Sequence, residues 1–537
     1  MHSGPEYLAR YKGLKERRQW WHDHWQELAD YIQPRRGYFQ EEHRRGDKLN
    51  LEIFDGTAGK AMELAAAGLY SRATNPASKW FDLRTPHRVL DTDAIKKHLA
   101  EIRDIQLSVV NKELASCLYQ VYQDLLVFGT ACLYIEEDDV RGIRGQVFPL
   151  HDIYIQENHA GEVDTVYRKF LLTAPQAIGR WGDKVSQEVK DYNLDQSDHE
   201  QLEFLHIVQP RTGHDITKSD SSNMPFESVW MEVKNGHVVE SGGYPEFPYA
   251  VPRLDVVPGE IYGRSPGMAA LPDIKTLNKM IEVTLDAANM QIRPPMNVPD
   301  EAYVDGLVLT PGYMNYNDDE SGRVATPIHT IGDVGMSNAM IEDRRMAIRD
   351  YFFNDQLELR GGGNQTAFEV QQRGQQQMLM MSPWHGRLEK ELFEKAVMRS
   401  YSILERAGWF PEAPEDLDGL DTLNVIYDSP LARSQRGADI SAIDQTIQFA
   451  MQFPDSGMME NVLTDETFRA RADYAGFPPQ LLNDLEAIRA NRQAAAEAAA
   501  QEEQAAMLAQ GASQLAALPG GADIVQQALS GQEGPAE

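Results

Sequence analysis

The segment from Glu260 to Ala407 constrains the fold of this chain more than any other part of its sequence. From Asp273 onward, apolar residues recur at helical spacing, and Pro294-Pro295 ends the pattern. The pattern predicts one amphipathic helix of roughly 31 Å at 1.5 Å per residue. Its apolar stripe consists of Ile274, Leu277, Ile281, Leu285, Ala288 and Ile292.

A second helix is predicted from near Ser337 to Leu359, where Arg360 and three glycines break the pattern. Its apolar residues include Met340, Ile341, Ile348 and Phe352. Between the two helices, the runs "GLVLTPGYMNY" and "RVATPIHTI" predict short strands around turns at Pro311-Gly312 and Ser321-Gly322. The series is therefore helix, β-containing insert, helix and glycine loop.

A third helix follows the glycine loop. Thr366 and Glu369 have the spacing of a capping box, in which each side chain bonds an unpaired amide of the first turn. We expect this helix to run to about Ala407, with a kink at Ser382-Pro383 because proline removes one backbone hydrogen bond.

Three stretches in this series resemble one known family. "YGRSPGMAALPDIKTLNKM", the loop and cap "GGGNQTAFEV", and "YDSPLARSQR" are similar to the head-to-tail connector, or portal, proteins of short-tailed bacteriophages. The resemblance extends in order from about Tyr7 to the alanine-rich tail and rests on the series and its spacing. It implies a ring of subunits, usually twelve, at one capsid vertex, through which double-stranded DNA is packaged and ejected. No cofactor is expected.

The resemblance also implies partners and a location. Besides copies of itself, the chain would contact the packaging terminase, the tail adaptor and tail tube proteins, the major capsid and scaffold proteins and internal core proteins. It would meet double-stranded DNA without sequence specificity and would not contact a membrane. We expect assembly in the host cytoplasm and a final place at the portal vertex of the virion.

The predicted fold class is α+β, mainly helical, with the portal arrangement of wing, stem, clip and crown. The expected divisions are an α+β wing (1–260), a first stem helix (261–293), a clip (294–336), a second stem helix (337–360), a tunnel loop (361–365), a long kinked helix (366–409), a crown with C-terminal helices (410–510) and a flexible low-complexity tail (511–537).

Three groups of residues are the candidate functional sites. Ring contacts along the stem are expected at Ile274, Leu277, Ile281, Leu285, Ile341, Ile348 and Phe352. By resemblance, the clip would dock the packaging motor and then the tail through Leu309, Pro311, Gly312, Tyr313 and Tyr316. The tunnel loop touching DNA would comprise Arg360, Gly361, Gly362, Gly363, Asn364 and Gln365, although a plain surface hinge between helices is the alternative.

The formal charge of −31 and the pI near 4.8 argue against a protein that grips nucleic acid, since such surfaces are normally basic. Acidity is compatible with a conduit through which a polyanion slides, and solubility alone would also account for it. Residues 411–537 contain 21 Asp and Glu against 6 Arg, a net charge of −15. About half of the excess thus lies in the last quarter.

Cys117 and Cys132 stand among apolar neighbours, which predicts buried free thiols and fits a reducing cytoplasm. We find neither a basic region followed by a short apolar core at the start nor a run of eighteen apolar residues, so secretory and membrane classes are not expected.

The sequence lacks two common catalytic motifs, HExxH and paired CxxC. Gly56-Thr57-Ala58-Gly59-Lys60 lacks the spacing and the Ser or Thr of a phosphate loop. Two hypotheses remain: a structural portal, or a nucleic-acid-processing enzyme such as a packaging nuclease or motor subunit. Particle mass separates them.

The flanking regions predict further helices and an antiparallel sheet. Helices are expected at 5–33, 57–72, 92–116, 119–128, 174–181, 440–453, 465–475 and 479–501. Strands are expected across 130–244, with a hairpin at Asn235-Gly236. In the first helix, basic residues interleave with Trp20, Trp21 and Trp25; packing against a neighbouring element is favoured over a stacking platform for single strands.

Overall fold

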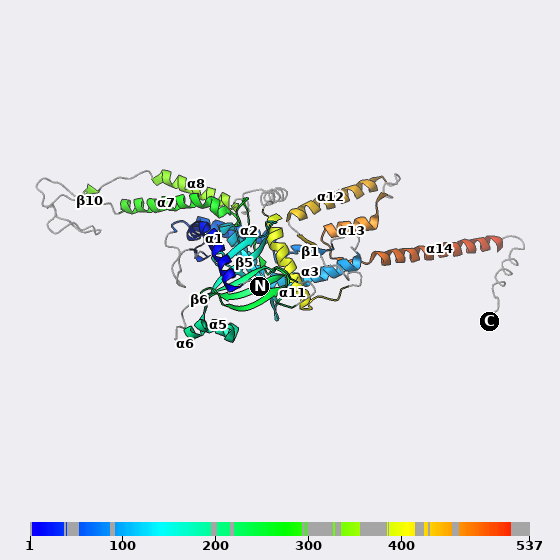
Figure 1. The fold of residues 1–537 in the computed structure, drawn as a ribbon. Helices are drawn as coiled ribbons and strands as arrows, with labels where there is room; N and C mark the ends of the chain where they lie inside the picture. The colour runs from blue at the N-terminus through cyan, green and yellow to red at the C-terminus, as the bar shows by residue number, and fades with distance from the viewer. Residues whose placement is uncertain are drawn as a thin grey trace. The chain divides into compact units, whose positions relative to one another are not determined.

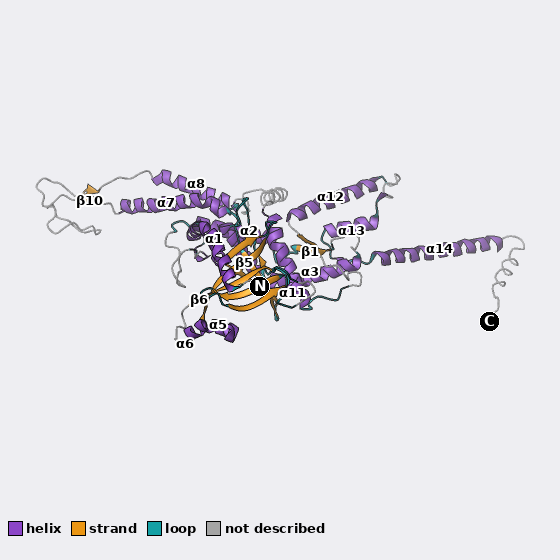
Figure 2. Ribbon diagram, in the orientation of Figure 1, coloured by secondary structure: helices purple, strands orange, loops and turns teal. Residues whose placement is uncertain are grey.

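A computed structural model describes residues 3–36, 39, 53–85, 92–194, 201–214, 220–292, 296–297, 326–327, 334–354, 384, 386–413, 424–427, 430–453 and 461–516. The chain forms two compact units. The first comprises 1–82, 103–411 and 425–433, and the second comprises 83–102, 412–424 and 434–537. The described residues are mainly helical, and the sheets of the first unit are seen in Figure 2. This confirms the α+β, mainly helical class.

The N-terminal helices form close to their predicted positions, but the boundary between the third and fourth lies at Leu114 instead of between Ser116 and Tyr119. α1 (Gly4–Ile32) begins with a capping box of Ser3 and Glu6 and ends at Gln33, before Pro34. The following helices are α2 (Thr57–Ala73), α3 (Asp93–Glu113), whose residues are divided between the two units, and α4 (Ala115–Phe128), which ends at the left-handed Gly129.

The strands between Cys132 and Ala250 form two sheets instead of the single expected sheet. Pro149 and the 3-10 turn Leu150–Asp152 interrupt the chain between β3 and β4, so the ladder cannot continue. The smaller sheet has the order β3 (Gly142–Phe148), β2 (Cys132–Asp138), β9 (Tyr249–Ala250). The larger is β4 (Ile153–Glu157), β5 (Val163–Thr173), β6 (Gln201–Pro210), β7 (Phe226–Glu232), β8 (Val238–Tyr244), all antiparallel.

Helices cover both faces of the larger sheet (Figure 1). Tyr7 and Tyr11 of α1 pack on one face with Ile207, while Trp181 packs on the other with Phe204. The predicted hairpin at Asn235-Gly236 joins β7 to β8, and Gly236 has a φ of 69°. α5 (Ala174–Trp181) has its predicted bounds, whereas α6 (Gln187–Leu194) was not predicted.

The two predicted stem helices are present with different ends. α7 (Pro266–Ile292) begins seven residues before Asp273, because the Ser265 hydroxyl accepts the Met268 amide at 3.0 Å and Pro266 suits a first helical position. α8 (Val334–Tyr351) stops before Leu359, since Phe353 adopts a left-handed φ of 58°. The helices lie side by side (Figure 1), and short strands β10 (Met296–Asn297) and β11 (Thr326–Pro327) pair between them in sequence.

The described part of the long helix contains a π turn, Glu389–Phe393, followed by α11 (Glu394–Arg406). α11 ends as predicted, before Gly408 with a φ of 70°. Gln106 of α3 fixes it by donating to the Val397 carbonyl at 2.7 Å and to Ser400 Oγ at 2.8 Å. The predicted cap at Thr366 and kink at Ser382-Pro383 lie outside the described residues.

The helices of the second unit are held mainly by charge. α12 (Pro430–Gln452) begins ten residues before its predicted start, α13 is Thr464–Tyr474, and α14 (Leu485–Ala516) extends past the predicted end. Among the described side chains of these helices, only Ala450 and Ala472 are buried. Asp93 accepts hydrogen bonds from Arg469 at 2.6 Å and from the Leu485 amide at 3.1 Å. Further pairs are Arg471 with Asp444, Arg84 with Asp473, Lys97 with Asp484 and Arg492 with Asp465.

Cys117 and Cys132 are buried free thiols, as predicted. Within the described ranges, no helix combines the length and the apolar character needed to cross a membrane.

Asp124 of α4 is a buried acid in the first unit. One carboxylate oxygen pairs with Arg36, whereas Oδ1 has no hydrogen-bond partner in the described structure. Burial raises the pKa of Asp124 to about 7, although the Arg36 guanidinium acts in the opposite direction. The folded protein therefore binds this proton more tightly than the unfolded chain does.

We expect Asp124 to make the free energy of unfolding fall as pH rises from about 4 to about 7, because the unfolded carboxyl ionises first. Asp124→Asn should remove this contribution, so that the difference in unfolding free energy between the variant and the parent changes in the variant's favour across that range. Urea unfolding at several pH values measures the difference. A difference independent of pH would contradict the prediction.

Candidate functional site

The structure tests the position of one of the three predicted groups of residues. The clip residues Leu309 to Tyr316 and the tunnel loop Arg360 to Gln365 lie outside the described residues, so their roles remain proposals. The stem residues on α7 and α8 are described.

The apolar stripe of α7 changes its surroundings along the helix. At the base, Ile274 and Leu277 are 4% and 2% exposed, because α1, α4 and α8 pack against them and their neighbours. Ile281 is half-buried, and farther along Leu285 and Ile292 are 50% and 77% exposed. One continuous stripe thus passes from the core of the subunit to its surface.

On α8, Ile341, Ile348 and Phe352 are buried within the subunit. Together with Ile274 and Leu277, they hold the two helices to the rest of the first unit. Of the seven predicted contact residues, only Leu285 is exposed and Ile281 is half-buried, so these two remain available to another subunit.

Ion pairs hold α8 to α7 and to the segment before α2. Arg344 of α8 meets Asp273 of α7 at 2.6 Å, and Arg345 meets Asp55, just before α2, at 2.8 Å. Burial opposes ionisation of Asp55, but hydrogen bonds from Thr57 and Arg345 outweigh it and hold its pKa below the ordinary value. These charged residues therefore hold the two helices within one subunit.

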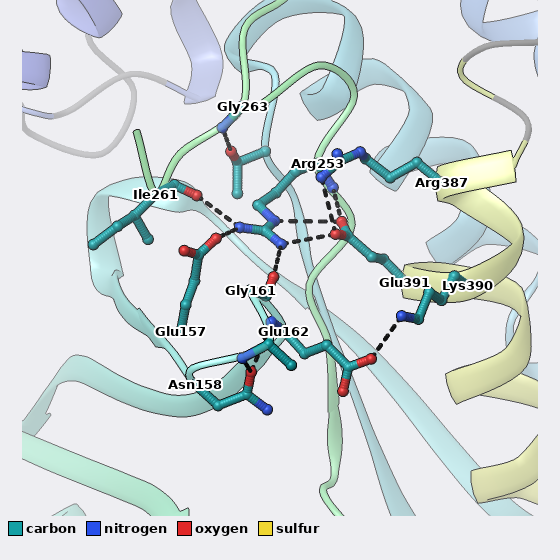
Figure 3. Close-up of polar contacts among 12 residues, drawn as sticks. Glu157, Asn158, Gly161, Glu162, Arg253, Ile261, Gly263, Arg387, Lys390 and Glu391 are labelled. Atoms are coloured by element: carbon teal, nitrogen blue, oxygen red, sulfur yellow. Dashed lines mark hydrogen bonds and ion pairs between the residues drawn. The ribbon is translucent and has the colours of Figure 1, made fainter. Parts of the chain in front are cut away.

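Arg253 is the centre of a polar junction at the start of α7 (Figure 3). Its guanidinium, 1% exposed, pairs with Glu157 and with Glu391, the latter at 2.8 Å. Nη1 also donates to the Ile261 carbonyl at 3.0 Å, and Nη2 donates to the Gly161 carbonyl at 2.9 Å. The backbone amide of Arg253 donates to Glu391 as well, at 2.8 Å.

The junction joins three segments that are distant in sequence. Glu157 and Gly161 belong to the β4–β5 hairpin, Ile261 precedes α7, and Glu391 lies in the π turn. Burial opposes the charge of Arg253, yet the two carboxylates more than compensate and raise its pKa. The guanidinium therefore stays charged and sets the relative positions of the β4–β5 hairpin, the segment before α7 and the π turn.

Sequence reasoning did not identify this junction. Arg253 stands in the apolar run "AVPRLDVV", and Glu391 stands in a helix rich in charge. One signal in the sequence could have indicated the junction: Arg253 is a single cation inside an apolar segment. If such a segment is buried, the cation needs buried hydrogen-bond acceptors.

Two glycines allow the backbone to pass closely next to this junction. A Cβ at Gly129, which ends α4 with a φ of 76°, would lie 2.3 Å from the Gly263 carbonyl oxygen, and a Cβ at Gly263 would lie 2.4 Å from the Gly129 oxygen. The Gly263 amide donates to Thr130 Oγ1 at 2.8 Å. The start of α7 is therefore set by backbone packing.

In the described ranges, no group of three or more His, Cys, Asp or Glu side chains could hold a metal ion.

Comparison with known proteins assigns the class. Residues 5–482 match the family described as "Bacteriophage head to tail connecting protein", so the chain belongs to this family. It is 30% identical over 537 residues to a "Probable portal protein" of Bordetella phage BPP-1, covering 97% of this chain and 96% of that protein. It is 29% identical over 526 residues to a "Portal protein" of Salmonella phage epsilon15, covering 94% and 93%.

These matches confirm the resemblance stated from the sequence and identify a portal-type connector. The family description names a structural connection and no catalytic activity. The enzyme hypothesis therefore gives way to the structural one.

We expect Gly129→Ala and Gly263→Ala each to lower the free energy of unfolding by at least about 2 kcal/mol, because each added Cβ meets backbone that cannot rotate away. Chemical denaturation measures the loss.

Gly13→Ala in α1 is the matched control, since nothing lies within 4 Å of its Cβ position. It should be neutral or stabilising by about 0.5–1 kcal/mol because alanine favours a helix. Equal effects of all three substitutions would contradict the close approach.

Proposed function

We propose that this chain is the portal subunit of a bacteriophage, that it closes into a ring of usually twelve copies at one capsid vertex, and that double-stranded DNA is packaged and ejected through the hole. Membership of the connector family over residues 5–482 supports this proposal. The structural observation that carries it is the exposed outer half of the α7 stripe.

An exposed apolar stripe at Leu285 and Ile292 is costly in water unless a partner covers it. Val283 and Met290 of α7 and Met340 of α8 are also more than half exposed. A second copy of the chain supplies a stem of the same composition, and repeated contacts between unlike faces close into a ring when the rotation closes. The stem tip is therefore the proposed subunit contact.

The insert between α7 and α8 is the proposed clip, which docks the packaging terminase and later the tail adaptor. Its support is position: the insert begins where the exposed end of α7 stops, and β10 pairs with β11 at its base. Residues Leu309 to Tyr316 are proposed as its contact core.

The acidic composition is compatible with passage of DNA. A net charge of −31 disfavours tight binding of phosphate, so a duplex could move without being held. Arg360 to Gln365 are proposed as the tunnel loop, with Arg360 as the cation that meets phosphate.

The decisive experiment is the particle mass of the purified full-length protein, measured by native mass spectrometry. The proposal requires a closed ring near twelve times 60.5 kDa, or a nearby integer multiple. A monomer with metal-dependent DNA cleavage would overturn it in favour of a packaging nuclease or motor subunit.

We expect the double substitution Leu285→Asp with Ile292→Asp to abolish ring formation while leaving the subunit folded, because both side chains are already exposed to solvent. Native mass spectrometry should show monomers, and thermal unfolding should resemble that of the parent subunit. Obligate interfaces bury roughly 2,000 Å² or more, so two charges at such a contact are not tolerated.

Two further substitutions frame this result. Thr276→Asp adds a charge to α7 at an exposed polar position, on the face opposite Leu285 and Ile292 and away from the tip, and should leave rings intact. Ile274→Asp places a charge in the core and should lower the free energy of unfolding of the subunit by about 3 kcal/mol or more. Intact rings in the double variant would refute the stem contact.

The tunnel-loop proposal is tested by replacing Gly361, Gly362 and Gly363 with valine. Valine stiffens the backbone and adds apolar bulk, so we expect normal rings but fewer DNA-filled heads. Counting filled particles by electron microscopy measures the effect. An unchanged yield would favour the surface hinge.

A further inference from the structure

The π turn Glu389–Phe393 contains one more residue than an α-helical turn would need. Its signature is the Glu394 amide, which donates to the carbonyl of Glu389, five residues back. Residues 386–388 before it and α11 after it are helical. Such a turn can relax into an α-helix only if the helix on one side rotates by about 100° and moves by about 1.5 Å.

The side after the π turn is fixed. Ala396, Val397, Ile403 and Leu404 of α11 are buried, and Gln106 bonds the Val397 carbonyl at 2.7 Å. Relaxation of the turn would therefore move Trp384 and residues 386–388.

Arg253 holds the turn in the π form. Glu391 accepts three hydrogen bonds from Arg253: from Nη2 at 2.8 Å, from the backbone amide at 2.8 Å and from Nε at 3.4 Å (Figure 3). Arg387 adds a bond at 3.3 Å. A π turn forms poorer backbone hydrogen bonds than an α turn, so it needs another contact to stabilise it. The charge-assisted bonds between Arg253 and Glu391 supply that contact.

The side before the turn contacts the end of α8. The ring of Trp384 meets the ring of Phe353 edge to face, with centroids 5.1 Å apart and planes at 82°. Phe353 has a φ of 58°, the only positive φ of a non-glycine residue in the described chain. Strained conformations of this kind persist only where surrounding contacts impose them.

We propose that the π turn is a two-position register switch: the Arg253–Glu391 contact holds it in the π form, and its state reaches the end of α8 through Trp384 and Phe353. With the contact broken, residues 386–393 become α-helical, Trp384 rotates away from Phe353, and the left-handed turn at Phe353 is released. The switch links the wing hairpin that contains Glu157 to the C-terminal end of stem helix α8.

Hydrogen exchange of the purified full-length protein tests the switch through two peptides, 386–394 and 349–354. Glu391→Gln keeps the shape of the side chain but removes its charge. Peptide 349–354 should then exchange at least tenfold faster, whereas peptide 386–394, which becomes α-helical, should exchange no faster than in the parent protein. Peptide 226–232 in β7 reports on the fold of the first unit and should not change.

Deletion of Lys390 supplies the sharpest comparison, because it removes the extra residue of the turn and leaves both flanking helices in their present register. In the Glu391→Gln background, the deletion should restore the parental exchange of peptide 349–354. Lys390→Gln is the matched control: it removes the charge of Lys390 and its 2.8 Å pair with Glu162 but keeps the extra residue of the turn, and it should change neither peptide.

Each other outcome overturns the proposal. Faster exchange in 386–394 means that the turn opens instead of becoming α-helical, and unchanged exchange in 349–354 means that nothing is transmitted to α8. Persistent exposure of 349–354 after the deletion means that the extra residue is not the switch. If Glu391→Gln exposes peptide 226–232 as well, Glu391→Asp is judged by the same peptides, and exposure in both variants means that the contact holds the whole fold.

Discussion

The arrangement of the first unit depends on one buried cation. Arg253 brings together the β4–β5 hairpin, the approach to α7 and the π turn, none of which is adjacent to another in sequence. Glu157 and Glu391 neutralise it, and two backbone carbonyls satisfy its remaining donors. Because an unpaired buried charge is far more costly than a paired one, the three segments are held as a set.

The two units use different stabilising forces. In the first, aromatic and aliphatic side chains of α1, α5 and α6 cover both faces of the larger sheet. In the second, the described side chains of α12, α13 and α14 bury little apolar area, and Asp93, Asp444 and Asp473 pair with arginines. Exposed ion pairs are weakened by salt, so these contacts of α12, α13 and α14 depend on ionic strength.

Local patterns predicted most helices and the hairpin at Asn235-Gly236, because caps, prolines and periodicity act within a few residues. These patterns gave wrong ends for two helices, because the Ser265 cap sets the start of α7 and the left-handed Phe353 follows the end of α8. They also predicted one sheet where Pro149 and the following turn separate two. The α7 stripe was found, but its division into a buried base and an exposed tip depends on tertiary packing. The Arg253 junction is non-local in the same way, so no short-range signal could show it.

The close contact of Gly129 with Gly263 has a mechanical consequence for a helix as long as α7. Its 27 residues span about 40 Å, so a rotation of about 5° at its first turn would displace Ile292 by about 3.5 Å. In a closed ring, an error of that size would recur at every copy and accumulate around the circumference. The contact between Gly129 and Gly263 thus fixes the direction of α7. Any variation in this contact would limit how accurately the exposed ends of α7 in neighbouring copies can meet.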